Sequence, residues 1–216
     1  MNKKLFAVVC IALLVLSFAA ARVVNFQLGP SFSFFKGETP MTEEINVPYK
    51  GTAFGVDTGF DLTFGPRAEV YFQENVNFSL KSVFGDNPKV DESWNTASID
   101  YKGHLGFEYA VITDPVKLSV GGGLAFELVS SIYQTKIDDE DYSLIVLDFN
   151  LGVGATVKAE FPIANHWAAY VRANIDYFPF AGFSMTTSKS SEEPYSNAGK
   201  ANNFSIDAAA GIVLYF

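Results

Sequence analysis

The chain has 216 residues, of which 15 are Lys or Arg, 24 are Asp or Glu, two are His and one is Cys. This length allows one sizeable domain, and a hydrophobic content of 49% is too high for a disordered chain. A single Cys excludes an internal disulfide and a Cys-rich zinc site. The net charge of −9 argues against a nucleic-acid partner, which normally requires a basic surface.

The first 21 residues have the layout of a secretory signal peptide. Two lysines precede an apolar run over residues 5–18, and alanines then offer a cleavage site after Ala21. One alternative is a membrane-spanning helix, for which the run is short. Another is a lipoprotein modified at Cys10, which has too few apolar residues before it. We therefore expect residues 1–21 to be removed and residues 22–216 to form one domain.

Downstream of this segment, apolar and polar residues alternate along the chain, which is the period of a β-strand. Gly65 and Pro66 interrupt the second run; we interpret them as a β-bulge, and the alternative is a turn that splits the strand. The pattern predicts eight strands, over about residues 23–35, 52–73, 76–85, 98–112, 116–134, 143–162, 166–180 and 203–216.

The connections between these predicted strands alternate in length. Short turns at one end and long loops at the other are typical of an up-and-down transmembrane barrel. The sequence therefore predicts an all-β fold, an eight-stranded antiparallel up-and-down transmembrane β-barrel. The expected tight turns are 73–75, 113–115 and 162–165, and the expected long polar loops are 36–51, 86–97, 135–142 and 181–202.

The apolar side of each strand is expected to face outward and the polar side to face the lumen. Ten of the 17 glycines share the polar side, which suits the narrow interior of an eight-stranded barrel. Charges of both signs share it too, and they must pair with one another if they are buried. The expected lumen polar network consists of Asp57, Asp61, Arg67, Glu69, Lys81, Asp100, Lys102, His104, Glu108, Lys117, Glu127, Asp148, Lys158, Glu160, Arg172, Asp176 and Asp207.

Aromatic residues on the apolar side gather toward the two ends of the predicted strands. Two such belts are expected where a transmembrane barrel meets the two membrane interfaces, although ordinary core packing is the alternative reading. The expected interface aromatics are Phe72, Tyr109, Phe161, Trp167, Tyr177 and Phe204.

The last strand carries a resemblance to a known family. It ends in Phe216 and has apolar residues at every second position before it, including Ala210, Ile212 and Leu214. The chain in this respect resembles the small eight-stranded outer-membrane barrels of diderm bacteria, which include the OmpA-type membrane domain, the OmpX group and the opacity proteins. The resemblance implies export to the outer membrane, contact with its lipid, and recognition of these four residues by the barrel-assembly machinery.

The sequence contains no pattern that predicts catalysis or a cofactor. No nucleophile elbow, phosphate loop or metal-ligand spacing occurs, and Gly121–Gly123 lacks the context of a dinucleotide site. His104, between Lys102 and Glu108 on the polar side, could form a His–carboxylate base, but a hydrogen-bonded interior histidine is the preferred reading. The acidic run Asp138–Asp141 could hold Ca²⁺ weakly, yet it lacks the spacing of a calcium loop and is read as solvated.

These observations predict a structural or surface-interaction protein of the outer membrane that is not an enzyme. A lumen filled by side chains argues against an open pore, and four external loops, above all 181–202, would meet host or environmental ligands. One alternative is a narrow channel for small or hydrophobic solutes, similar to the OmpW group. That group is expected to have an apolar lumen, whereas the expected lumen of this chain contains many charged residues. Another is a lipid-modifying barrel enzyme, for which no nucleophile presents itself.

Overall fold

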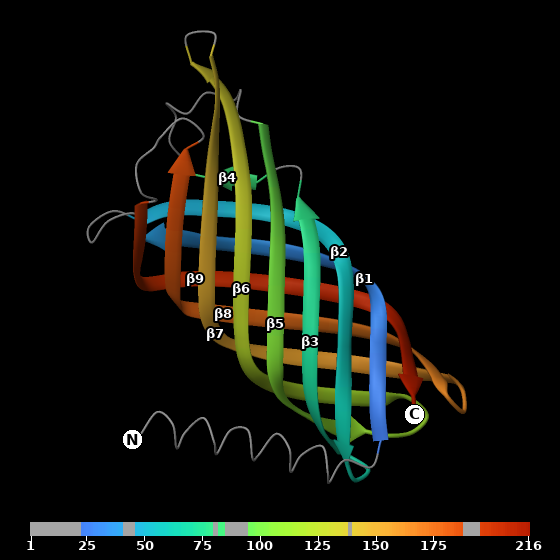
Figure 1. Cartoon of the computed structure of the whole chain (residues 1–216). Helices are drawn as coiled ribbons and strands as arrows, with labels where there is room; N and C mark the ends of the chain where they lie inside the picture. The colour runs from blue at the N-terminus through green and yellow to red at the C-terminus, as the bar shows by residue number, and fades with distance from the viewer. Residues whose placement is uncertain (1–22, 41–45, 80–81, 85–94, 138–139, 188–194) are drawn as a thin grey trace.

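The chain folds into a closed antiparallel β-barrel (Figure 1). The computed structural model describes residues 23–40, 46–79, 82–84, 95–137, 140–187 and 195–216. No helix in these ranges is long and apolar enough to cross a membrane. The strands are β1 (Val23–Pro40), β2 (Asn46–Phe64), β3 (Ala68–Ser79), β4 (Ser82–Phe84), β5 (Asn95–Ile112), β6 (Lys117–Ile137), β7 (Glu140–Ala164), β8 (Trp167–Thr187) and β9 (Tyr195–Tyr215).

Eight long strands make the wall, and each pairs with its neighbours in the chain. The barrel closes because β1 pairs with β2 on one side and with β9 on the other. The short β4 continues the line of β3 beside β2, with its register changed by one residue. The predicted fold class, an eight-stranded up-and-down barrel, is confirmed for the described residues.

The two ends of the barrel differ. Short turns join β2 to β3, β5 to β6 and β7 to β8, and Phe216 lies at this same end, where its backbone amide donates to the carbonyl of Val24. We call this the turn end. At the opposite end, which we call the hairpin end, β6 and β7 rise farthest above the wall (Figure 1).

The prediction of one long strand over 52–73 is wrong. Residues 65–67 form a turn, so β2 ends at Phe64 and β3 begins at Ala68. Gly65 has a φ of 85°, a conformation that glycine adopts without strain, and Pro66 follows it where no ladder hydrogen bond is needed. The alternative of a splitting turn is therefore correct, and the predicted turn at 73–75 lies inside β3.

The predicted long loops are largely strand. Pairing between β1 and β2 runs out to Pro40 and Asn46, β6 and β7 pair as far as Ile137 and Glu140, and β8 and β9 pair as far as Met185 and Tyr195. Glu140 and Asp141 of the acidic run are thus strand residues, whereas 138–139 and most of 86–97 lie outside the described residues. These segments are rich in polar residues, which is why the sequence pattern resembles that of loops.

Burial alternates along most of each long strand in the sense that the sequence predicts, with Leu62 on β2 and Gly103 on β5 as buried outward positions. Along β9, for example, Asn203, Ser205 and Asp207 are buried, whereas Phe204 and Ile206 are exposed. The surface around the barrel wall is consequently apolar. Its exposed large side chains include Phe26, Leu28, Phe54, Phe78, Ile99, Phe107, Leu124, Phe149, Val157, Val171, Ile175 and Ile212.

Glycines allow close approach of the strands where the barrel closes. A Cβ atom at Gly29 would overlap the carbonyl oxygen of Ala210, and one at Gly211 would overlap that of Leu28. These two glycines lie side by side across the β1–β9 seam, where only a residue without a side chain fits.

Candidate functional site

The turn-end half of the lumen is organised around one lysine. The ammonium group of Lys158 lies 2.6 Å from Asp61, 2.9 Å from Glu108, 3.1 Å from Glu160 and 3.7 Å from Glu69. All five side chains are almost fully buried, and they come from β2, β3, β5 and β7. A single cation therefore holds four strands of the wall together through ion pairs.

Arg172 of β8 fills the lumen beside this cluster. Its guanidinium donates to Gln27 of β1, lies 3.7 Å from Asp57 of β2, and has its central carbon 5.6 Å from the ring centre of Tyr170. The hydroxyl of Tyr170 donates in turn to Asp57. The side chain of Gln73 also donates to Asp57, at 2.6 Å, so this carboxylate collects donors from several directions. Such a set satisfies a buried charge with several hydrogen bonds.

The hairpin-end half of the lumen contains a second lysine, Lys102 of β5. Its ammonium donates to Asp207 at 2.8 Å, and it lies 3.3 Å from Glu127 and 3.4 Å from Asp100. It also donates to the hydroxyl of Ser33 on β1. Lys102 therefore links β5 across the lumen to β1 and β9, which are not its neighbours in the wall.

His104 follows Lys102 on the inner side of β5, and its partner is on the opposite wall. The Nε2 atom of His104 is 2.9 Å from Oδ2 of Asp176, and the hydroxyl of Ser205 donates to the same oxygen at 3.1 Å. The serine thus bonds to the carboxylate rather than to the imidazole. This is not the order of a nucleophile activated by a base, so the three residues do not form a catalytic triad.

Amides extend the network toward the hairpin end. Asn150 donates to Glu127 at 2.7 Å and accepts a hydrogen bond from Asn203 at 2.6 Å, while Thr39 donates to Asp148 at 2.7 Å. These contacts link β7 to β6, β9 and β1 in the hairpin-end half of the lumen. The polar network therefore crosses the lumen at several levels along the barrel axis.

The structure places most of the expected lumen residues in the interior. Arg67 is the exception: it lies in the turn between β2 and β3 with an exposed side chain, so its assignment to the lumen is wrong. Lys117 lies at the turn end with a side chain that is 20% exposed, and Lys81 lies outside the described residues. Buried in the lumen are Asp57, Asp61, Glu69, Asp100, Lys102, His104, Glu108, Glu127, Asp148, Lys158, Glu160, Arg172, Asp176 and Asp207.

Several uncharged residues that fill the lumen were not predicted as members of the network. Gln27, Gln73 and Asn150 connect charged groups, and Tyr71 and Tyr170 are among the largest fully buried side chains. All five lie on the same side of their strands as the charged residues. Their strand period is therefore a sufficient signal, and the predicted network lacks them because it contains only Asp, Glu, Lys, Arg and His residues.

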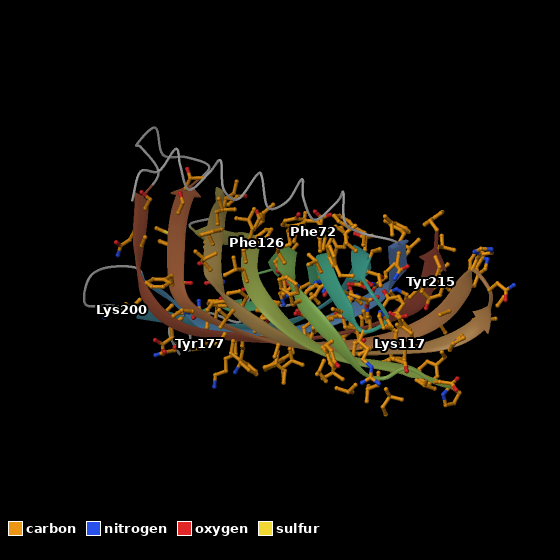
Figure 2. The ribbon with its side chains drawn as sticks, turned by 90° about the horizontal axis from the view of Figure 1, so that it is seen from below. Phe72, Lys117, Phe126, Tyr177, Lys200 and Tyr215 are labelled. Atoms are coloured by element: carbon orange, nitrogen blue, oxygen red, sulfur yellow. The ribbon has the colours of Figure 1, made fainter. Side chains whose placement is uncertain are left out.

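The aromatic residues predicted at the interfaces point outward, but one lies elsewhere than expected. Phe72 lies inside β3, its ring 5.3 Å from that of Phe60, because the turn expected after it does not exist. Figure 2 shows Tyr177 near Lys200 toward one end of the barrel and Lys117 with Tyr215 toward the other. The remaining outward aromatics are Tyr109, Phe161 and Trp167 near the turn end, and Tyr177 and Phe204, which pair with each other on β8 and β9.

Comparison with known proteins shows the fold. No protein-family model matches the chain, and no curated protein sequence matches it. Among solved structures, a major outer membrane protein from Thermus thermophilus superimposes with a TM-score of 0.60 at 15% identity, over 87% of this chain and 99% of that one. The chain has the fold of an outer-membrane β-barrel.

A second solved structure supports this barrel fold. The outer membrane protein OprG from Pseudomonas aeruginosa superimposes with a TM-score of 0.60 at 9% identity, over 91% of this chain and 97% of that one. The outward apolar side chains of the barrel suit contact with lipid, and a closed barrel leaves no unpaired strand edge in the membrane. The apolar outer wall therefore suits a barrel that spans the bilayer with most of its charged wall residues inside; Glu74 of β3, on the outer side, accepts a hydrogen bond from the hydroxyl of Tyr101 at 2.9 Å.

Proposed function

We propose that this outer-membrane barrel is a closed scaffold that displays the hairpin end to the outside of the cell. The observation that carries the proposal is the filled lumen. Arg172, Tyr71, Tyr170, Lys102 and Lys158 are each 2% exposed or less, although all of them lie on the inner side of the wall. Side chains held by buried ion pairs leave no continuous path for a solute.

The strands at the hairpin end support a display role. On β1 the outward side chains change from Phe32 and Phe34 to Lys36 and Glu38, and on β9 they change from Phe204 to Asn202 and Lys200. Polar outward residues are expected beyond the apolar band of a membrane barrel. The wall therefore continues past the membrane as paired strands, and this rigid rim offers a surface to host or environmental ligands.

The outward direction of the hairpin end rests on barrel architecture. Bacterial outer-membrane barrels have short turns on the periplasmic side and longer connections on the outside. The turn end also contains Phe216, and Ala210, Ile212 and Leu214 lead up to it on the same side of β9. We propose that these four residues are the part of β9 that the barrel-assembly machinery contacts.

The purified barrel is expected to show no steady conductance in planar lipid bilayers. The reason is that the fully buried Lys102, Lys158 and Arg172 occupy the lumen. The positive control for conductance is the Lys158→Ser variant, inserted in the same bilayer, because it shortens one of the side chains that block the lumen. Regular single-channel steps from the unaltered protein would instead favour a narrow channel.

Cysteine labelling is expected to establish which end faces outward. The only Cys in the chain is Cys10, so a single new thiol at Ser196 or His166 is unambiguous in the mature protein once the expected signal peptide is removed. Both side chains are exposed, Ser196 near the hairpin end and His166 in a short turn. On intact cells, a membrane-impermeant maleimide is expected to label Ser196→Cys and to leave His166→Cys unlabelled until the cells are broken. The reverse pattern would refute the proposed direction of display.

A further inference from the structure

The lumen contains more negative charge than its cationic side chains can balance. Among the described residues that face inward, ten are carboxylates and four are Lys or Arg, an excess of six negative charges. The imbalance is largest in the hairpin-end half, where Lys102 is the one inward Lys or Arg described. Buried carboxylates without a counter-charge are costly, so a carboxylate in this half of the lumen is stabilised either by a proton or by a further cation. Its carboxylates are Asp100, Glu127, Asp148, Asp176 and Asp207.

Two groups of three side chains in the lumen have the spacing of metal ligands. Asp61, Glu69 and Glu160 each offer a carboxylate oxygen within 4.8 Å of the others, but the ammonium of Lys158 lies within 3.7 Å of all three. The protein supplies its own cation there. This group is therefore an ion-pair cluster rather than a metal site.

The second group consists of His104, Asp176 and Asp207, and within the described residues no ammonium group joins its three members. Their potential ligand atoms also lie within 4.8 Å of one another, and the side chains are 2%, 0% and 1% exposed. Lys102 contacts one of them, Asp207, through its Oδ1 atom. The group thus resembles the Lys158 cluster in spacing and burial but has no lysine at its centre.

Unpaired atoms in the same group point to a ligand. Within the part of the chain that the structure describes, Nδ1 of His104, Oδ1 of Asp176 and Oδ2 of Asp207 are buried and have no hydrogen-bond partner. Buried polar atoms in native proteins are normally paired, so these three atoms have room for a water or an ion. The Asp61, Glu69 and Glu160 group also has one such oxygen on each side chain, but there Lys158 supplies the cation. The negative charge of the His104 group selects a cation.

We propose that His104, Asp176 and Asp207 bind one divalent transition-metal cation, of which Zn²⁺ is the best match. An imidazole nitrogen with two carboxylate oxygens is a donor set that suits Zn²⁺, whereas Ca²⁺ and Mg²⁺ prefer oxygen alone. The hydroxyl of Ser205, which donates to Asp176, positions that carboxylate. The three ligands come from β5, β8 and β9, so the metal fastens opposite walls of the barrel to each other.

The test measures metal uptake by the complete barrel, refolded in detergent micelles without metal and then dialysed against Zn²⁺. One Zn²⁺ per barrel is expected for the unaltered protein. His104→Gln is expected to weaken binding by more than about 100-fold, beyond the usual effect of losing an outer-shell partner. His166→Gln is the matched control, since His166 is the only other histidine and lies exposed in a turn, and it is expected to bind normally. No uptake by the unaltered barrel, or equal uptake by His104→Gln, would overturn the proposal.

A measurement on the unaltered protein keeps the test decisive if His104→Gln does not fold. Because the chain has two histidines, nitrogen NMR of histidine-labelled barrel shows two imidazoles, and His166→Gln assigns them. Zn²⁺ is expected to shift the His104 resonances at one equivalent and to leave those of His166 unchanged. Unchanged His104 resonances would overturn the proposal, and so would Ca²⁺ binding as tightly as Zn²⁺ at this site.

Discussion

Replacing Lys158 with Met is expected to destabilise the barrel by about 3–5 kcal/mol, the cost of breaking a buried ion pair by removing one partner. The ammonium of Lys158 contacts Asp61, Glu108 and Glu160 within 3.1 Å, and methionine has a similar length but no charge. The variant leaves several carboxylates buried without their cation. Urea unfolding in detergent micelles, followed by the shift between the compact and unfolded bands on unheated gels, measures the loss.

The matched control for this effect is Lys200→Met, which makes the same chemical change at an exposed position on the outer side of β9. Its free energy of unfolding is expected to stay within about 0.5 kcal/mol of the unaltered value. If Lys158→Met proved as stable as Lys200→Met, the lumen network would not be what holds the wall together.

Replacing Leu124 with Arg is expected to cost about 2–4 kcal/mol and to reduce insertion into lipid vesicles. Leu124 lies in the middle of β6, opposite Leu105 and Val153 on the neighbouring strands, and its side chain is 61% exposed on the outer side. A charge there would face hydrocarbon rather than water. Folding yield in vesicles and urea unfolding both report the effect.

Ser196→Arg is the control for Leu124→Arg, because Ser196 is also exposed on the outer side but lies near the hairpin end. Its stability is expected to be unchanged, since that part of the wall lies in water. A Leu124→Arg barrel that inserts as well as Ser196→Arg would show that the apolar surface does not contact lipid.

The direction in which side chains point was predictable because a strand has a period of two. Once the polar side was assigned to the lumen, the interior position of residues as distant as Asp57 and Asp207 followed from their parity alone. Strand ends were less predictable. The apolar pattern continues through Gly65 and Pro66, so periodicity did not show the turn, and the positive φ of Gly65 became evident only in the folded chain.

The pairing inside the lumen could not be derived from local sequence. The charged residues nearest to His104 on the inner side of its own strand are Lys102 and Glu108, yet it pairs with Asp176, 72 residues away. Lys102 likewise reaches Asp207, 105 residues away. An eight-stranded barrel is narrow enough for side chains to span it, and partners across the lumen depend on strand tilt and register.

The position of Asp207 on the last strand has a consequence for biogenesis. Lys102 receives this counter-ion from β9, and the seam of Gly29 and Gly211 also joins β9 to β1. During assembly, a sheet that lacks its final strand therefore has an open edge, and its Lys102 lacks one of three carboxylate partners. Docking of the carboxy-terminal segment removes both defects in one step, so cylinder closure and charge compensation become a single cooperative event.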